Sequence, residues 1–280
     1  MLKLIRIYFR ILSVASPKLA ANSAFKVFQK IRIKSIRDRE KPFYEKAQHF
    51  HIQHEEEAID AYELGNKDGK LIFLIHGWES NAGCLLKIAE EFVDLDYRVI
   101  AFNLPGHAFY EKSSTNLLQC KLAFEQVLSE INPTEPFDVV SHSFGSAVVA
   151  NALADSDYEV NRLTFLTNPN KVENIFRQFQ DIVNLGDKAF DKLLLKVNDL
   201  IGDDMSTMDV ENQLKKVKFA DFMMIHDEND KILPFSNSEE ILENIKPSNL
   251  HVLKDVGHYR MLWNDEVIKQ VVGFVSPPIS

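Results

Sequence analysis

The chain has 280 residues, of which 45% are hydrophobic and 26% are charged. This composition allows a large buried core and excludes a disordered protein. Its two cysteines, Cys84 and Cys120, lack metal-ligand spacing and exclude a disulfide scaffold, which favours a reducing, cytoplasmic compartment. Every window of about 20 residues contains charge, so we expect no membrane-spanning helix.

The charge divides the chain into a basic arm and an acidic body. Residues 1–50 hold 12 Lys or Arg and 3 Asp or Glu, a formal charge of +9. The total is −9, so residues 51–280 carry −18. An acidic body lacks the basic face that nucleic acids require, and we therefore expect no nucleic-acid partner. The arm, by contrast, suits a negative surface.

The arm, residues 1–48, reads as two amphipathic helices. Apolar residues in the first helix follow a spacing of three and four, with a basic strip beside them; the apolar set is Leu2, Ile5, Phe9 and Leu12, and the basic set is Lys3, Arg6 and Arg10. Pro17 ends this helix, and a second stretch runs from about Leu19 to Ile36. Two interpretations stay open: the apolar face packs on the body, or residues 1–16 bind anionic lipid peripherally.

From about His49, strand and helix patterns alternate. Eight strands are predicted, and helical patterns separate the later ones; the strands are His49–His54, Ala58–Leu64, Leu71–His76, Arg98–Leu104, Phe137–Ser141, Arg162–Thr167, Asp221–His226 and Asn249–Lys254. The four central runs are almost wholly apolar, which is typical of parallel strands covered on both faces. About fifty residues from Asn170 to Lys218 lack a strand pattern. We therefore expect an α/β domain over 49–280 with a helical cap at about 170–220.

A serine lies at a sharp strand-to-helix junction. The strand that begins at Phe137 runs into Ser141, His142, Ser143, Phe144 and Gly145, and a helix follows at once. Such a turn exposes the serine hydroxyl, and the helix N-terminus stabilises developing negative charge. Ser143 is therefore the candidate nucleophile, although Ser141 stands where the usual GxSxG pattern has glycine.

A base and an acid for this serine follow later in the chain. Asp227, Glu228 and Asp230 come after the strand that ends at His226, and His258 follows the last strand in a glycine-led turn. A serine hydroxyl needs a histidine base oriented by a third group. The order of serine, acid and histidine is the α/β-hydrolase order.

An oxyanion hole requires two backbone N–H donors near the nucleophile. The segment His76, Gly77 and Trp78 ends an apolar strand and supplies one candidate donor, the N–H of Trp78, while Phe144 supplies the other. His76, Gly77 and His142 are candidates for substrate contact, and the two histidines also suit local hydrogen bonding around these segments.

From about His51 onward the chain resembles the α/β-hydrolase superfamily, in particular bacterial esterase- or lipase-like members. The matching segments are HGW at 76–78, NLPGH at 103–107, SHSFG at 141–145, HDENDKILP at 226–234 and GHYRML at 257–262. The resemblance selects Asp230 as the acid and places Asp227 at a position often held by glycine. It implies an eight-stranded, mostly parallel sheet, a cap after the sixth strand, and no metal or organic cofactor.

The implied activity is hydrolysis of a carboxylic ester or thioester through Ser143, Asp230 and His258. The altered glycine positions leave an alternative, an impaired scaffold that binds a ligand or partner, and the arm leaves another, a membrane-surface adaptor. Neither the physiological substrate nor the oligomeric state can be derived from the sequence.

One further group of residues has metal-ligand character. Strand alternation places His49 and His51 on one face, where two imidazoles could share a metal. No carboxylate or cysteine partner is identifiable in the sequence, and we interpret the segment as a solvated edge strand.

Overall fold

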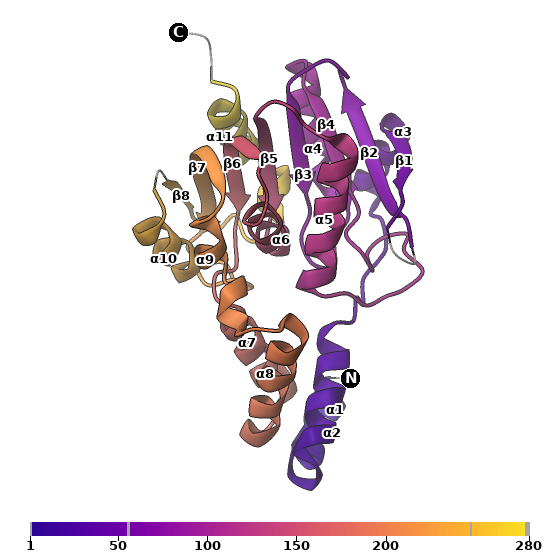
Figure 1. The fold of residues 1–280 in the computed structure, drawn as a ribbon, viewed down its shortest axis with the longest axis vertical. Helices are drawn as coiled ribbons and strands as arrows, with labels where there is room; N and C mark the ends of the chain where they lie inside the picture. The colour runs from indigo at the N-terminus through magenta and orange to yellow at the C-terminus, as the bar shows by residue number, and fades with distance from the viewer. Residues whose placement is uncertain (1, 55–56, 247, 278–280) are drawn as a thin grey trace.

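The computed structural model describes residues 2–54, 57–246 and 248–277, and eight strands form its sheet (Figure 1). The spatial order is β1-β2-β4-β3-β5-β6-β7-β8. The strands are β1 (Gln48–Ile52), β2 (Ile59–Gly65), β3 (Leu71–Ile75), β4 (Arg98–Phe102), β5 (Phe137–His142), β6 (Glu159–Leu166), β7 (Lys218–Asp227) and β8 (Asn249–Leu253). All eight lie where the hydrophobic pattern predicts them, with ends that differ by at most three residues.

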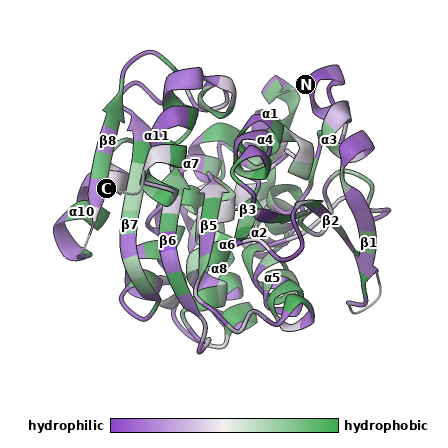
Figure 2. Cartoon of the chain, turned by 90° about the horizontal axis from the view of Figure 1, so that it is seen from above, coloured by the Kyte–Doolittle hydropathy of each residue, from purple (hydrophilic) through white to green (hydrophobic). Residues whose placement is uncertain are grey.

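The sheet is mostly parallel, which confirms the expectation from the sequence. β1 pairs with β2 and β2 with β4 in antiparallel fashion, whereas the pairs from β4 across to β8 are parallel. Every residue of β5 is buried, because helices cover both faces of the central strands. Figure 2 shows the contrast between hydrophobic central strands and the hydrophilic edge strand β1.

Helices form a layer on each face of the sheet. One layer holds α3 (Lys41–Lys46), α4 (Leu86–Asp94) and α11 (Asp265–Val275), whose apolar residues share a core with the sheet. The other holds α5 (Leu117–Ile131), α6 (Phe144–Leu153), α9 (Val210–Leu214) and α10 (Ser236–Asn244). The parallel strands end at one common edge, so the loops that follow β3, β5, β6, β7 and β8 converge there.

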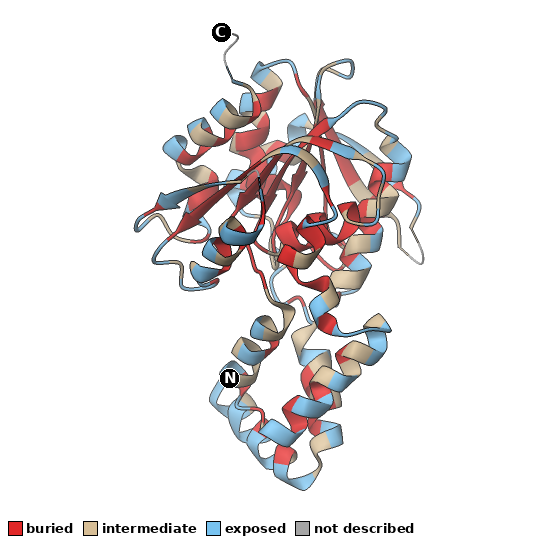
Figure 3. Cartoon of the chain, turned by 60° about the vertical axis from the view of Figure 1, so that its left-hand side comes forward, coloured by how far each residue is buried: buried red, intermediate tan, exposed pale blue. Residues whose placement is uncertain are grey.

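The arm and the cap form a separate helical unit beside this edge (Figures 1 and 3). The arm contributes α1 (Leu2–Ala15) and α2 (Pro17–Phe28), and the cap contributes α7 (Val172–Val183) and α8 (Asp187–Ile201). These four helices enclose their own apolar core, which includes Phe9, Ala24, Phe176, Phe190 and Leu193. The apolar face of the arm therefore packs on the cap rather than on the layers around the sheet.

The second arm helix is shorter than predicted, which corrects the expected end at Ile36. It ends at Phe28, and the chain then extends along the body. Lys30 forms an isolated bridge with Ser114, and the N–H of Ile31 donates to the Ser113 carbonyl at 2.9 Å. Ile31 is buried there. Pairing with a distant loop thus replaces the helical hydrogen bonds that the local pattern favours.

Candidate active site

Ser143 occupies a strained turn between β5 and α6. Its backbone has φ 55° and ψ −122°, a conformation that residues with a side chain rarely adopt. The Ser143 N–H is shared between the carbonyls of Leu166 and Thr167, each at 3.1 Å, which fastens the turn to the end of β6. The serine side chain is thereby held at the carboxyl edge of the sheet, at the N-terminus of α6.

Two glycines allow the backbone to close around this turn. A Cβ atom on Gly145 would lie 2.5 Å from the His76 carbonyl oxygen, so only glycine lets α6 approach β3 this closely. A Cβ on Gly77 would lie 3.0 Å from the Ser143 Cβ. The HGW and SHSFG segments therefore meet directly at the serine.

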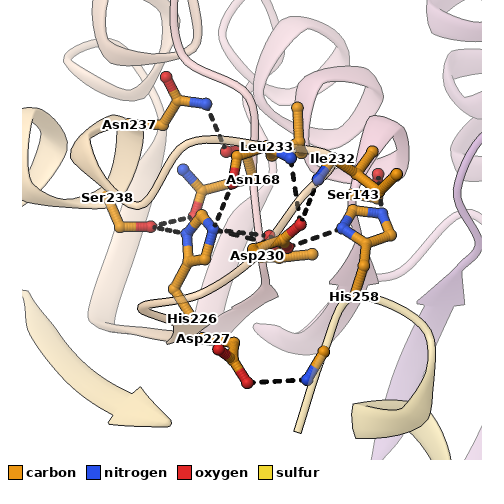
Figure 4. Close-up of polar contacts among 12 residues, drawn as sticks. Ser143, Asn168, His226, Asp227, Asp230, Ile232, Leu233, Asn237, Ser238 and His258 are labelled. Atoms are coloured by element: carbon orange, nitrogen blue, oxygen red, sulfur yellow. Dashed lines mark hydrogen bonds and ion pairs between the residues drawn. The ribbon is translucent and has the colours of Figure 1, made fainter. Parts of the chain in front are cut away.

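Ser143, His258 and Asp230 form a continuous chain of polar contacts (Figure 4). His258 Nε2 lies 3.0 Å from Ser143 Oγ, and His258 Nδ1 lies 2.8 Å from Asp230 Oδ2. Ser143 and His258 are 8% and 6% exposed, so little water competes for these hydrogen bonds. The structure brings together the three side chains that the sequence singles out. Ser143 and Asp230 are more than 80 residues apart in the sequence, and Asp230 and His258 are 28 residues apart.

The Asp230 carboxylate is held in its ionised form by its surroundings. Oδ1 accepts from the N–H groups of Ile232 and Leu233 at 2.7 and 3.1 Å, and Oδ2 accepts from the Thr167 hydroxyl at 3.0 Å. Burial alone raises the pKa of Asp230, but the contact with His258 and the backbone donors outweigh it and lower the pKa to about 2. The negative charge beside His258 Nδ1 therefore persists across the neutral range.

Asp227 has a different partner from Asp230. Its Oδ2 accepts from the Gly257 N–H at 2.7 Å and its Oδ1 from the Asn229 N–H at 2.8 Å. Burial raises the pKa of Asp227, but these backbone donors lower it overall. The carboxylate thus links the loop that carries Asp230 to the loop that carries His258, without contacting the imidazole. This placement favours Asp230 over Asp227 as the orienting acid.

His226 is a neighbour of the acid that the sequence analysis did not single out. Its Nε2 lies 3.7 Å from Asp230 Oδ2 and 3.0 Å from Thr167 Oγ1, and its Nδ1 lies 2.7 Å from Ser238 Oγ. Burial lowers the pKa of His226. A neutral imidazole that donates from Nε2 to Thr167 leaves the threonine hydroxyl to donate to Asp230. The available signal was its position at the end of β7, beside the acidic run.

Three more histidines lie buried around the site. His76 accepts the Leu104 N–H at Nε2 (3.0 Å) and contacts the Gly77 carbonyl from Nδ1 (2.7 Å), while His142 Nε2 contacts the His258 carbonyl at 2.9 Å. Burial lowers the pKa of His76 well below its ordinary value, that of His142 to about 3 and that of His107 to about 4. These contacts fit local hydrogen bonding; substrate contact by His76, Gly77 or His142 stays a prediction.

The two expected oxyanion donors lie on adjacent segments. The rings of Trp78 and Phe144 meet edge to face with their centroids 5.1 Å apart. The Phe144 N–H belongs to the first turn of α6, which has no intrahelical acceptors. Gly77, next to Trp78, lies against Ser143, so the Trp78 segment also borders the serine. The role of these two N–H groups as oxyanion donors stays a prediction.

Ser141, which stands at a usual glycine position, fits without disturbing the turn. It is fully buried, and its hydroxyl lies 3.0 Å from the hydroxyl of Ser146 on α6. Ser146 also contacts the Thr167 carbonyl at 3.4 Å. The Ser141–Ser146 contact adds a polar link between β5 and α6 next to Ser143.

Comparisons with known proteins agree with this architecture. A family model described as the alpha/beta hydrolase fold matches residues 70–198. An esterase from Pyrococcus furiosus is similar in structure, with a TM-score of 0.65 at 17% identity over 88% of this chain and 97% of that one. No curated protein matches the chain in sequence.

Two further solved structures are also similar to this chain. A membrane phospholipase A, described as a bacterial virulence factor, has a TM-score of 0.63 at 16% identity and covers 98% of both chains. A thioesterase domain from the curacin biosynthetic pathway has a TM-score of 0.62 at 14% identity over 82% of this chain and 99% of that one. The sheet order, the strained turn at Ser143 and these matches show the α/β-hydrolase fold, as the resemblance in the sequence predicts.

Proposed function

We propose that this protein is a serine esterase that hydrolyses carboxylic esters or thioesters through Ser143, His258 and Asp230. The observation that carries the proposal is the contact chain of 3.0 and 2.8 Å through the two nitrogens of His258. Structural neighbours named as an esterase and a thioesterase domain support the same reaction class.

In the proposed reaction, Asp230 fixes the proton of His258 on Nδ1, which leaves Nε2 free to act as a base. Ser143 Oγ attacks the substrate carbonyl while its proton passes to His258 Nε2. The carbonyl oxygen becomes an oxyanion that the N–H groups of Trp78 and Phe144 stabilise, by roughly 3–4 kcal/mol for each donor.

The tetrahedral intermediate then collapses: the bond to the leaving alcohol or thiol breaks, and His258 returns the proton to that group, which leaves an acyl ester on Ser143. A water molecule next gives one proton to His258 and attacks the acyl carbon, which forms a second tetrahedral intermediate. The bond from the acyl carbon to Ser143 Oγ then breaks, His258 returns its proton to Oγ, and the carboxylic acid leaves. Asp230 stays ionised throughout, consistent with its pKa of about 2.

Covalent labelling tests the nucleophile directly. A fluorophosphonate should add one phosphonyl group to the wild-type chain, seen by intact-mass measurement, and Ser143→Ala should remove the adduct. Ser141→Ala is the matched control, because this serine is buried two residues away and bonds to Ser146. An adduct of equal size on Ser143→Ala would reject the assignment, and an unlabelled wild-type chain would favour the non-catalytic scaffold.

A second proposal concerns where the enzyme meets its substrate: we propose that α1 binds the surface of an anionic membrane. Ile5, Phe9 and Leu12 of α1 face the core shared with the cap, yet a second apolar row is exposed on the opposite side. That row consists of Leu4, Ile7, Ile11 and Val14, which are 55–86% exposed. Its residues follow a spacing of three and four, so they form one continuous stripe.

Positive charge lines one side of this stripe. Lys3, Arg6 and Arg10 lie between the exposed row and the face that packs on the cap, and Arg6 donates to the carbonyls of Asp181 and Ile182 at the end of α7. An exposed apolar stripe with a basic edge is the pattern of helices that lie in a lipid interface. No helix within the described residues is long and apolar enough to cross a bilayer. The substrate would then be an acyl ester presented at that surface.

Vesicle sedimentation separates this proposal from the first. The wild-type chain should pellet with vesicles containing phosphatidylglycerol, and the double variant Ile7→Asn/Ile11→Asn should stay in the supernatant. The control is Leu122→Asn, which changes an exposed leucine on α5 of the body. Equal recovery of the stripe variant and the wild type would reject the membrane role, whatever the outcome of the labelling experiment.

A further inference from the structure

Strands β1 and β2 bring two histidines and a carboxylate together at the edge of the sheet. In the antiparallel register His51 lies opposite Asp60, and His49 lies opposite Tyr62. His49 Nε2 is 2.9 Å from Asp60 Oδ1, and His51 Nδ1 is 3.2 Å from the same oxygen. One ligand atom from each of the three residues lies within 4.8 Å of the others. Asp60 is thus the carboxylate partner that the sequence did not reveal.

The three side chains are arranged for access from solvent. The Asp60 side chain is only 15% exposed, whereas the side chains of His49 and His51 are 43% and 65% exposed. The His49 ring stacks on Tyr62, with 4.9 Å between centroids and 16° between planes, and meets the His51 ring edge to face at 4.5 Å. The carboxylate is therefore anchored in the sheet, one imidazole is held by stacking, and the other is open to an incoming ion.

From this geometry we propose a divalent metal site formed by His49, His51 and Asp60, with Zn²⁺ as the best-matched ion. Two ligand atoms of a tetrahedral zinc ion, each at about 2.0–2.1 Å from the metal, lie roughly 3.3 Å apart. The two observed separations from Asp60 Oδ1, 2.9 and 3.2 Å, are close to that value, and the two imidazole nitrogens lie within 4.8 Å of each other, so side-chain rotations would bring all three onto one ion. Imidazole nitrogens and a carboxylate oxygen suit Zn²⁺ far better than Ca²⁺ or Mg²⁺, which prefer oxygen ligands.

The site is separate from the proposed esterase chemistry. β1 is the first strand of the sheet order and β8 the last, and the contacts of Ser143 involve the ends of β5, β6, β7 and β8 (Figure 1). The metal would join β1 to β2 across the exposed edge. We therefore infer a stabilising ion that fastens an edge strand, with water at the fourth coordination position.

Metal titration of the full chain tests the proposal. Calorimetry at pH 7.5 should show one Zn²⁺ bound per chain, Co²⁺ substitution should give the visible absorption of a tetrahedral complex, and saturating Zn²⁺ should raise the melting temperature. His51→Asn and Asp60→Asn should each weaken binding about tenfold or more.

The matched control is His251→Asn, which removes an exposed histidine from β8 at the opposite edge of the sheet. This variant should bind Zn²⁺ as the wild type does. Melting in the presence of a chelator checks that each variant is folded before metal is added. If the wild type binds no Zn²⁺, or if His51→Asn and Asp60→Asn bind it as tightly as the wild type, the three residues form only a hydrogen-bonded cluster and the proposal is wrong.

Discussion

The carboxyl edge of the sheet and the arm–cap unit are held in place by different interactions: hydrogen bonds between buried polar groups at the edge, and apolar packing in the arm–cap unit. At the edge, polar side chains are buried and each is fixed by named partners, as Asp230 is by Thr167, Ile232, Leu233 and His258. In the arm–cap unit the interior is almost purely apolar, while further apolar residues remain exposed on α1. Directional hydrogen bonds set positions within tenths of an ångström, whereas apolar packing fixes an orientation and leaves a surface for other partners.

The largest expected effect on turnover comes from removing the negative charge of Asp230 at the carboxyl edge of the sheet. Asp230→Asn should reduce kcat for a nitrophenyl ester about 10⁴-fold, because the amide no longer holds His258 in the correct tautomer. Asp227→Asn should reduce kcat only about 10- to 100-fold, because Asp227 accepts a hydrogen bond from the Gly257 N–H and does not contact the imidazole of His258. Steady-state kinetics on both variants decide between the two acids. The reverse ranking would make Asp227 the orienting residue.

A cavity in the apolar core of the arm–cap unit should lower the stability of that unit much more than it lowers the turnover of an ester. Phe9 is buried between the arm and the cap, and Phe9→Ala should destabilise this unit by about 3–5 kcal/mol through the cavity it leaves. Hydrogen exchange of α7 and α8 measures this loss, and Leu4→Ala, at an exposed position of α1, should change it by less than about 0.5 kcal/mol. Turnover of a short soluble ester should fall far less than in Asp230→Asn. A comparable fall would mean that the cap shapes the catalytic edge.

A smaller effect on activity is expected from a substitution that tests how tightly the backbone packs around Ser143. Gly77→Ala places a methyl group 3.0 Å from the Ser143 Cβ and from His142 Nδ1, which forces one segment to move. A shift of about 1 Å at reacting groups lowers kcat/KM on the order of 10²-fold. Gly273→Ala on α11 is the control, because an added Cβ there meets nothing within 4 Å. Full activity in Gly77→Ala would show that the HGW segment has room to adjust.

Most of the sheet could be predicted from the sequence because buried parallel strands leave a local signal. The apolar runs of β3 to β6 indicate strands buried on both faces. The order of serine, acid and histidine predicts which loops meet, and the family resemblance selects Asp230 among the acids. The second arm helix was predicted too long, because Ile31 makes its backbone contact with Ser113, far away in sequence. Asp60 escaped notice for the same reason: its place beside His49 and His51 depends on the strand register, which a single sequence does not specify.

The buried histidines near the carboxyl edge of the sheet make the stability of the fold depend on pH. Burial lowers the pKa of His107 to about 4, against an ordinary value near 6.5, although the backbone contacts with Pro105 and Leu104 and the charge of Glu79 oppose this shift. Between pH 6.5 and 4 the unfolded chain therefore binds a proton that the folded chain excludes. The free energy of unfolding should fall as the pH drops through this window, by about 1.4 kcal/mol per pH unit for each such histidine, and His142, with a pKa of about 3, adds to the same slope.

Urea unfolding at several pH values measures this slope, and His107→Asn isolates one contribution. Asparagine retains a donor for the Pro105 carbonyl, which His107 Nδ1 contacts at 3.0 Å, but does not titrate. Between pH 6.5 and 4 the slope of the variant should therefore be smaller than that of the wild type by up to the contribution of one proton, about 1.4 kcal/mol per pH unit. An unchanged slope in His107→Asn would mean that the imidazole accepts its proton in the folded state, and that the loop after β4 opens to water at acid pH.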